Sequence, residues 1–454
     1  MALKVVILAA GKGTRMRSNM PKVLQPLASK PLLQHVIDTA EKLSSDQIIT
    51  VIGHGAEQVK STVDGSNLVY TVQENQLGTG HAVVQANDFF NEDDTVLILY
   101  GDVPLTSVET LRDLLTLVDA NNPIALLTIN LDDSTGYGRI VRNTHNLIEA
   151  IVEQKDALPS QLLIKEVNTG IMAVNGGQLT TWLENLDDSN AQGEFYLTDI
   201  IEMAVQDGFC VQSTHPSDEI EVLGVNDKIQ LQALERRYQL KLANDLMVSG
   251  VTLIDASRLD IRGSLSAAQD VVIDVNTVFE GTVILGENVR IGANCILKNV
   301  TIANNTTIEP FSHLEDCVVG ESCSIGPYAR LRPGTNLASN VKVGNFVETK
   351  KVNIGVGSKI SHLSYIGDTT MGADVNIGAG TITCNYDGVN KFQTVIGDNV
   401  FVGSDSQLVA PVNIGNGATI GAGSTITKDS PENELTLSRS KQMTVKGWVK
   451  PVKK

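Results

Sequence analysis

The first half of the chain alternates short apolar runs with longer amphipathic segments. Residues 30–43 and 107–120 carry apolar side chains at helical spacing and predict helices. Runs rich in β-branched residues predict strands at 4–10, 47–53, 67–73, 95–102 and 124–131. Apolar strands that alternate with helices indicate a mostly parallel sheet covered on both faces. We therefore expect a Rossmann-like α/β domain over residues 1–226.

Residues 227–247 form a different kind of segment. They contain neither Gly nor Pro and predict one long helix. Two roles fit such a helix: a connection between domains, or the last packed helix of the first domain. We interpret it as the linker.

From residue 248 to 454 the pattern changes. An aliphatic residue, often followed by Gly, recurs every six positions, as in Ile354-Gly355, Ile360 and Ile366-Gly367. Six is neither the period of a helix nor the alternation of an ordinary strand. It is the period of a hexapeptide solenoid, in which three edges make one triangular coil of about 18 residues. The sequence therefore predicts a left-handed parallel β-helix with the aliphatic side chains inside.

The six-residue pattern is interrupted most strongly at residues 383–395. This segment, TCNYDGVNKFQTV, is rich in Asn, Asp and Tyr. A solenoid needs no such insertion for its own packing, so we expect the segment to loop out of the prism. Loops carried by a rigid scaffold often hold functional residues.

Composition narrows the possible partners and location. The 39 glycines and the 4% of aromatic residues suit a narrow prism with tight corners. A formal net charge of −17 makes nucleic acid and anionic membranes poor partners. No apolar run approaches the roughly 18 residues that span a bilayer. The five cysteines form no CxxC pair, which favours free thiols and a cytoplasmic location.

The first strand leads into a glycine-rich turn at residues 8–16, LAAGKGTRM, and then PKVL at residues 21–24. Such a turn can present backbone N–H groups to phosphate oxygens, with Arg15 and Lys22 adding positive charge. It has only two of the three glycines of a dinucleotide fingerprint and lacks the end of a Walker loop. The turn alone could serve only the backbone.

Further motifs follow in order along the chain: QLGTGHA (76–82), LYGDVPL (99–105), GYGRI (136–140), IVEQKDA (151–157), VNTGI (167–171) and GVND (224–227). Together with the opening G-x-G-T-R and P-K, they resemble the nucleoside-diphosphate-sugar pyrophosphorylases. With the β-helix added, nearly the whole chain resembles the bifunctional enzymes that make UDP-N-acetylglucosamine. The resemblance implies acetylation of glucosamine 1-phosphate with acetyl-CoA, then transfer of UMP from UTP to N-acetylglucosamine 1-phosphate. It also implies a homotrimer that supplies peptidoglycan and lipopolysaccharide synthesis.

The resemblance assigns a Mg²⁺ site to Asp102 and Asn226. One carboxylate and one amide oxygen, completed by phosphates and waters, suit this hard cation. The remaining assignments of the uridylyl site are Leu8, Ala9, Ala10 and Gly11 for base and ribose, Arg15 and Lys22 for phosphates, Gln73, Gly78 and Thr79 for uracil, Gly138, Glu153 and Asn168 for the sugar, and Tyr100 and Gly101 beside the metal.

His362 in SHLSYIGD (361–368) is the predicted catalytic residue of the second half. It lies between the prism-forming Ile360 and Ile366, at a position expected to point outward. An amine that attacks a thioester must lose a proton, and a neutral imidazole suits that task. Without its motif, a single surface histidine would be an ordinary residue.

The resemblance also assigns the surroundings of His362. They are Arg332, Lys350, Tyr365 and Asn376 for the sugar phosphate, and Ala379, Asn385, Tyr386, Ser404, Ala422 and Arg439 for acetyl-CoA. Lys391 is a further basic residue that could serve the coenzyme. Ser361 and Gly421 depart from the family's usual Gly and Ala. Two other functions stay open for the β-helix: a silent trimerisation scaffold, or a nucleotide-responsive regulatory module.

Overall fold

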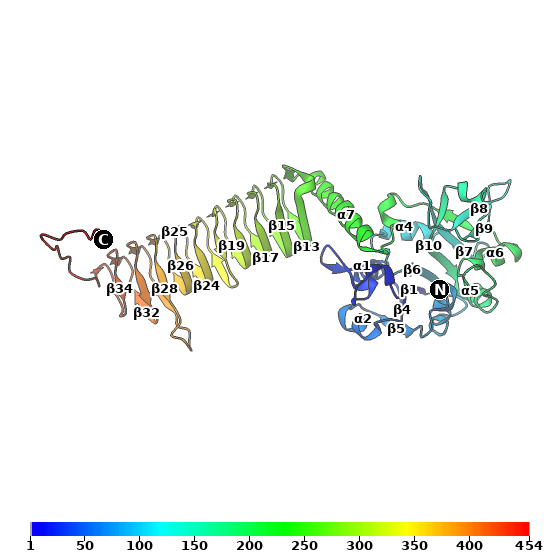
Figure 1. Ribbon diagram of the computed structural model, residues 1–454, viewed down its shortest axis with the longest axis horizontal. Helices are drawn as coiled ribbons and strands as arrows, with labels where there is room; N and C mark the ends of the chain where they lie inside the picture. The colour runs from blue at the N-terminus through cyan, green and yellow to red at the C-terminus, as the bar shows by residue number, and fades with distance from the viewer. Residues whose placement is uncertain (1, 454) are drawn as a thin grey trace. The chain divides into compact units, whose positions relative to one another are not determined.

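The computed structural model describes residues 2–453, which form two compact units (Figure 1). The first extends to Tyr238 and the second begins at Gln239, so the division falls inside helix α7 (Lys228–Val248). This single helix confirms the long helix predicted over 227–247. Leu234 of α7 packs in the first unit, and Ala243 and Leu246 pack in the second.

The first unit is built on a sheet in which strands from distant parts of the chain are neighbours. Its order is β11 (Gln212–Thr214), β7 (Ile124–Asn130), β10 (Glu166–Asn175), β6 (Thr95–Tyr100), β1 (Leu3–Ala9), β4 (Gln47–Ile52), β5 (Leu68–Val72). All five predicted strands are present. β10 runs antiparallel to both of its neighbours on this path, and the other pairs are parallel. The hairpin β8 (Arg139–Arg142) and β9 (Ile148–Val152) joins the sheet through β10.

Helices cover both faces of this sheet. They are α1 (Leu32–Lys42), α2 (Ala56–Thr62), α3 (Thr79–Val84), α4 (Val108–Leu115), α5 (Gly176–Leu183) and α6 (Asp199–Gln206). Along β1, Val5 and Ile7 enter one core cluster, whereas Val6 and Leu8 enter the other. Successive side chains of a strand point to opposite faces, which explains why the strand is apolar throughout.

One predicted helix is too long. The amphipathic pattern over 107–120 gives α4, which ends at Leu115. The continuation fails because Asp119 caps a turn instead, accepting hydrogen bonds from the backbone N–H groups of Asn121 and Asn122 at 2.8 Å each. An aspartate side chain that bonds its own nearby backbone competes with helix formation.

The second unit is a parallel β-helix, as the six-residue period predicts. Its strands form two long ladders in which every pair is parallel, and partners are one coil apart: Val343 pairs with Ile360 and Leu259 with Thr277. Strands β12 to β22 occupy residues 252–337. The strands that follow include β23 (Lys342–Asn345), β24 (Glu348–Ile354), β25 (Lys359–His362), β26 (Tyr365–Met371), β27 (Asn376–Ile377), β28 (Ile382–Cys384), β29 (Thr394–Ile396), β30 (Phe401–Val402) and β33 (Thr419–Ile420).

The repeating aliphatic residues fill the prism. Ile354, Ile360 and Ile366 are buried in one continuous cluster that extends along the solenoid. Each coil therefore stabilises its neighbours, which is how solenoid repeats obtain a hydrophobic core. No helix among residues 2–453 is long and apolar enough to cross a membrane.

The predicted excursion at 383–395 leaves the prism, but only over residues 385–393. β28 ends at Cys384 and β29 begins at Thr394, and both strands pair with β26 inside the stack. Between them Tyr386 and Lys391 form an antiparallel bridge, so the insertion is a short hairpin-like excursion. The loop projects from the strand stack in Figure 1.

Candidate substrate sites in the two units

The first unit holds a cleft of about 320 Å³ at the carboxyl ends of its parallel strands. Ligands of open α/β sheets commonly bind at this edge. The cleft is lined by ten predicted residues, namely Leu8, Ala9, Ala10, Gly11, Lys22, Gln73, Gly78, Thr79, Tyr100 and Asp102. The same residues come from the ends of β1, β5 and β6, from the start of α3 and from the turn at Lys22, so residues as far apart in sequence as Leu8 and Asp102 meet here.

Two glycines of this cleft have opposite surroundings. No atom of the described chain lies within 4 Å of the position that a Cβ would take at Gly11, apart from its immediate neighbours. At Gly78 the same atom would lie 2.5 Å from the carbonyl oxygen of Phe195, and φ is +115°. Gly78 is therefore required by the fold, whereas Gly11 leaves open space beside the cleft.

Hydrogen bonds fix the positions of Gln73, Gly78 and Thr79. The Gln73 side-chain amide donates to the Gly78 carbonyl at 3.1 Å and lies 3.0 Å from His81 Nδ1. The hydroxyl oxygen of Thr79 accepts the backbone N–H of Leu197 at 3.1 Å, and its own proton can still be donated. Gln73 is 3% exposed, so the fold fixes this amide before any ligand arrives.

Asp102 and Asn226, the predicted metal ligands, share one cationic partner. Lys22 Nζ forms an ion pair with Asp102 and donates to Asn226 Oδ1 at 3.3 Å. Arg15 also donates to Asn226 Oδ1, at 2.9 Å. The backbone ties the two ligands together as well, because Val225 N–H donates to the Asp102 carbonyl at 3.0 Å. Two hard oxygens aimed at one positive charge fit a Mg²⁺ ion completed by substrate oxygens.

The predicted sugar residues Gly138, Glu153 and Asn168 lie close to one another. Asn168 N–H donates to the Gly138 carbonyl at 2.9 Å, and a Cβ at Gly138 would lie 3.3 Å from Glu153 Oε1. Burial raises the pKa of Glu153, and Asp156 raises it further, although a hydrogen bond from Thr198 lowers it. Burial also raises the pKa of Tyr100, with Glu153 and Asp102 adding to the effect.

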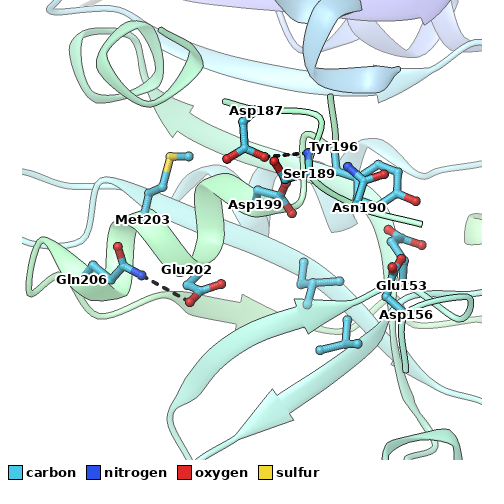
Figure 2. Close-up of a pocket in the computed structure, with 12 residues that line it drawn as sticks. Glu153, Asp156, Asp187, Ser189, Asn190, Tyr196, Asp199, Glu202, Met203 and Gln206 are labelled. Carbon is cyan, nitrogen blue, oxygen red and sulfur yellow. Dashed lines mark hydrogen bonds between the residues drawn. The ribbon is translucent and has the colours of Figure 1, made fainter. Parts of the chain in front are cut away.

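Glu153 also lines a second, acidic cavity of about 440 Å³ (Figure 2). Asp156, Asp187, Asp199 and Glu202 surround it, and Figure 2 shows their carboxylates gathered around this opening. The pKa of Asp199 is raised to about 6, mainly by burial and then by Asp187, Glu153, Glu202 and Asp156. The carboxylates therefore repel one another when ionised.

The segment Glu194–Asp199 belongs to the site but was missed by sequence reasoning. Phe195 N–H donates to the Leu77 carbonyl at 2.8 Å, and Gly80 N–H donates to the Phe195 carbonyl at 2.9 Å. Glu194 lines the 320 Å³ cleft, and the Thr198 hydroxyl donates to Glu153 Oε1 at 3.4 Å. The available signal was the short apolar run of Phe195, Tyr196 and Leu197 in EFYLTD, which predicts only a short buried strand.

In the second unit, His362 ends β25 and is exposed. The strand register places later coils directly beneath it: Ile360 pairs with Ile377, Ile377 with Val402, and Val402 with Ile420. The residues two positions after these paired strand residues are His362, Ala379, Ser404 and Ala422. They therefore form one column along an edge of the prism. Small residues thus follow His362 along one edge, and Arg439 reaches this column by donating to the Ala422 carbonyl at 2.9 Å.

Tyr365 and Asn385 meet above Gly367. A Cβ at Gly367 would lie 2.5 Å from the Tyr365 hydroxyl and 2.9 Å from Asn385 Nδ2. Asn385 is 8% exposed, and its amide donates to Asp368 Oδ2 at 2.5 Å. The glycine of SYIGD therefore makes room for two predicted site residues. Tyr386, by contrast, is exposed and donates to the Gly388 carbonyl of its own loop.

A basic group lies on the neighbouring edge. Lys350 has its pKa lowered by Lys391 first and then by Arg332, so three positive charges are close together. Arg332 is paired with Glu348 at 2.7 Å. Lys391, expected near the coenzyme, is thus placed against the predicted phosphate residues instead.

Within one prism, a corner separates the residues that are predicted to bind the sugar phosphate and to catalyse acetyl transfer into two groups. Lys350 and Tyr365 lie on β24 and β26, whereas His362 and Asn376 lie on β25 and β27 of the other ladder. One chain therefore presents the two groups on adjoining faces.

The chain resembles known proteins over its whole length. Residues 5–153 match the MobA-like NTP transferase domain, residues 261–354 match the GMPPB C-terminal domain, and residues 393–428 match six bacterial transferase hexapeptide repeats. A protein of Hydrogenovibrio crunogenus named bifunctional protein GlmU is 68% identical over 100% of both chains. Proteins of the same name from Ralstonia nicotianae and Marinobacter nauticus are 55% and 56% identical, over 99% of each chain.

Proposed function

The chain belongs to the GlmU family of bifunctional proteins, and we propose that it catalyses two consecutive steps towards UDP-N-acetylglucosamine. Glucosamine 1-phosphate is acetylated with acetyl-CoA, and UMP is then transferred from UTP to N-acetylglucosamine 1-phosphate with release of pyrophosphate. The product supplies peptidoglycan and lipopolysaccharide synthesis. The observation that carries this proposal is the 68% identity over the full length of both chains.

The proposal divides the chain by function. Residues 1–226 form the uridylyltransferase, residues 227–247 the linker helix, and residues 248–454 the acetyltransferase. This division is supported by the separate cores of the two units and by the different domain matches at 5–153 and 393–428.

In uridylyl transfer, the chain mainly positions charge. Arg15 and Lys22 hold the phosphates of UTP, and the open space at Gly11 lets the nucleotide approach the backbone. Asp102 and Asn226 hold Mg²⁺, which neutralises phosphate charge when bound. Glu153 accepts hydrogen bonds from sugar hydroxyls, and Gln73 binds the uracil from its fixed position.

In acetyl transfer, His362 removes a proton from the amine of glucosamine 1-phosphate. The amine nitrogen forms a bond to the thioester carbonyl carbon, the carbon–sulfur bond breaks, and the proton passes to the departing thiolate. Arg332, Lys350 and Lys391 hold the sugar phosphate. Tyr365, Asn376 and Asn385 orient the sugar and acetyl groups, assisted by Tyr386. The coenzyme lies along the small residues Ala379, Ser404 and Ala422, with Arg439 meeting its phosphate.

The proposal includes a cytoplasmic homotrimer. One support is that the residues proposed to bind glucosamine 1-phosphate lie on two adjoining faces of the prism. A second support is an exposed aromatic stack. Phe311, Tyr328 and Phe346 stack with ring centroids 5.0 and 5.3 Å apart and are each about half exposed. Such an apolar surface suits burial against a neighbouring prism. Light scattering should give three times the chain mass of 48.6 kDa.

The decisive experiment supplies glucosamine 1-phosphate, acetyl-CoA, UTP and Mg²⁺ together and omits each in turn. We expect N-acetylglucosamine 1-phosphate without UTP, and no product without acetyl-CoA. His362→Ala should abolish acetylation and spare uridylyl transfer, because only the former needs the base. Asp102→Ala should do the reverse. A β-helix that serves only as a scaffold or regulatory module would give no acetylation in the intact chain.

A further inference from the structure

His362 has a polar partner on the preceding coil. Its Nδ1 lies 2.7 Å from Oδ1 of Asn345, the last residue of β23. The two residues are directly paired in the parallel ladder, so their side chains project side by side from successive coils. Asn345 is half-buried, whereas the imidazole is exposed. The contact therefore ties the inner edge of the ring and leaves the far nitrogen, Nε2, on the open side.

This contact determines which ring nitrogen carries the proton. An amide oxygen can only accept, so in the neutral ring the N–H must sit on the Nδ1 beside it. Nε2 then keeps its lone pair and can take a proton from an amine. With the opposite tautomer, Nε2 would already be protonated and could not act as the base.

We propose that Asn345 is a positioning residue for acetyl transfer, which selects the tautomer and orientation of His362 through this hydrogen bond. The inference rests on the proposed role of His362 as the base. The balanced step is unchanged: Nε2 takes the amine proton, the nitrogen–carbon bond forms as the carbon–sulfur bond breaks, and Nε2–H returns the proton to the thiolate.

A purely structural explanation is available, because amides stack along other corners of this prism. Asn336 donates to Asn353 at 3.1 Å, and Asn276 donates to Asn294 at 3.0 Å. The column of Asn345 differs from those ladders. In the two coils before Asn345, the strand register places Pro310 and Pro327 at the position equivalent to Asn345. In the three coils after His362, the equivalent residues are Ala379, Ser404 and Ala422. The Asn–His pair is thus an isolated polar contact in a column of mostly small, weakly polar residues.

The test compares three variants of the full chain in acetyl transfer. Asn345→Ala removes the hydrogen-bond acceptor and should lower kcat by roughly tenfold or more. This is a part of the roughly 10²–10⁴-fold that a general base contributes to the rate. KM for glucosamine 1-phosphate should be unchanged. Asn345→Asp keeps an acceptor facing Nδ1 and should restore most of kcat. Asn336→Ala, which breaks a structural amide ladder, should leave kcat unchanged.

Uridylyl transfer and the melting temperature of each variant report on folding, and His362→Ala is the reference. If Asn345→Ala retained full kcat while His362→Ala were inactive, the positioning role would be wrong and the base assignment would stand. If Asn345→Asp were as slow as Asn345→Ala with normal folding, the amide would not act as an acceptor and the inference would be overturned. If His362→Ala itself were fully active, the proposed function of His362 would fail first.

Discussion

Gly11 and Gly78 line the same cleft, but only Gly78 is required by the protein's own packing. A methyl group at Gly11 would meet only ligand, so Gly11→Ala should fold normally and weaken UTP binding. We expect KM for UTP to rise roughly tenfold, equivalent to about 1.4 kcal/mol of binding energy. Steady-state kinetics and a thermal melt check both parts.

Gly78→Ala is the matched control and should lose about 2–4 kcal/mol of stability, because it adds backbone strain and a steric clash. An unchanged KM in Gly11→Ala would show that the nucleotide does not approach this residue.

Asp199 offers a pH-dependent prediction. Its pKa is raised to about 6, mainly by burial and then by neighbouring carboxylates. The folded chain therefore binds this proton more tightly than the unfolded chain does. The resulting stability is complete below the ordinary aspartate pKa and is lost as pH rises through about 6. Asn carries no charge at any pH, so Asp199→Asn should be more stable than the native chain by about 1 kcal/mol at about pH 8, after allowance for solvent screening.

Melting temperatures at about pH 8 and about pH 4 test this sign, since linkage makes the gain vanish in acid. Asp188→Asn, at an exposed position nearby, is the control for a general change in net charge. An equal gain at both pH values would contradict the proposed origin in the burial of an ionised carboxylate and its repulsion by neighbouring carboxylates.

At the residue scale, sequence reasoning located the groups but not their partners. The motifs place Asp102 and Asn226 in the same site, but they do not show that both contact Lys22. That contact depends on the fold, because Lys22 and Asn226 are more than 200 positions apart in the sequence. The acidic cavity around Glu153 was not predicted at all. Its carboxylates come from separate segments, and no local pattern links Asp187 or Asp199 to Glu153.

At the scale of elements, the period of six was the strongest predictor, because every edge of the prism must turn an aliphatic residue inward. The excursion at 383–395 could be located as an interruption of that period. Its bridge between Tyr386 and Lys391, and the approach of Lys391 to Lys350, could not, because both depend on the loop folding back.

The excursion should be dispensable for folding and required for acetyl transfer. β28 and β29 pair inside the stack without it, so replacing residues 386–391 with two glycines should preserve the melting temperature. Acetyl transfer should be lost with Tyr386 and Lys391, and uridylyl transfer retained. Replacing only 387–390, which leaves Tyr386 and Lys391 in place, is the control. Wild-type acetylation by the larger replacement would remove the loop from the proposed site.

For the whole molecule, the division into two units bears on how the intermediate passes between reactions. Each unit has its own hydrophobic core, and each proposed site is built from residues of one unit. The acetylated sugar can therefore leave one site and enter the other through solvent. A mixture of His362→Ala and Asp102→Ala chains should then convert glucosamine 1-phosphate to UDP-N-acetylglucosamine, because each variant supplies the step that the other lacks.

The time course gives the sharper measurement. Free diffusion requires N-acetylglucosamine 1-phosphate to accumulate before UDP-N-acetylglucosamine appears, and the lag should lengthen when the mixture is diluted. The native chain, diluted in the same way, is the control for a lag that comes only from assembly. If each variant performed its own reaction but the mixture formed no final product, both sites would have to belong to one chain, and passage through solvent would be excluded.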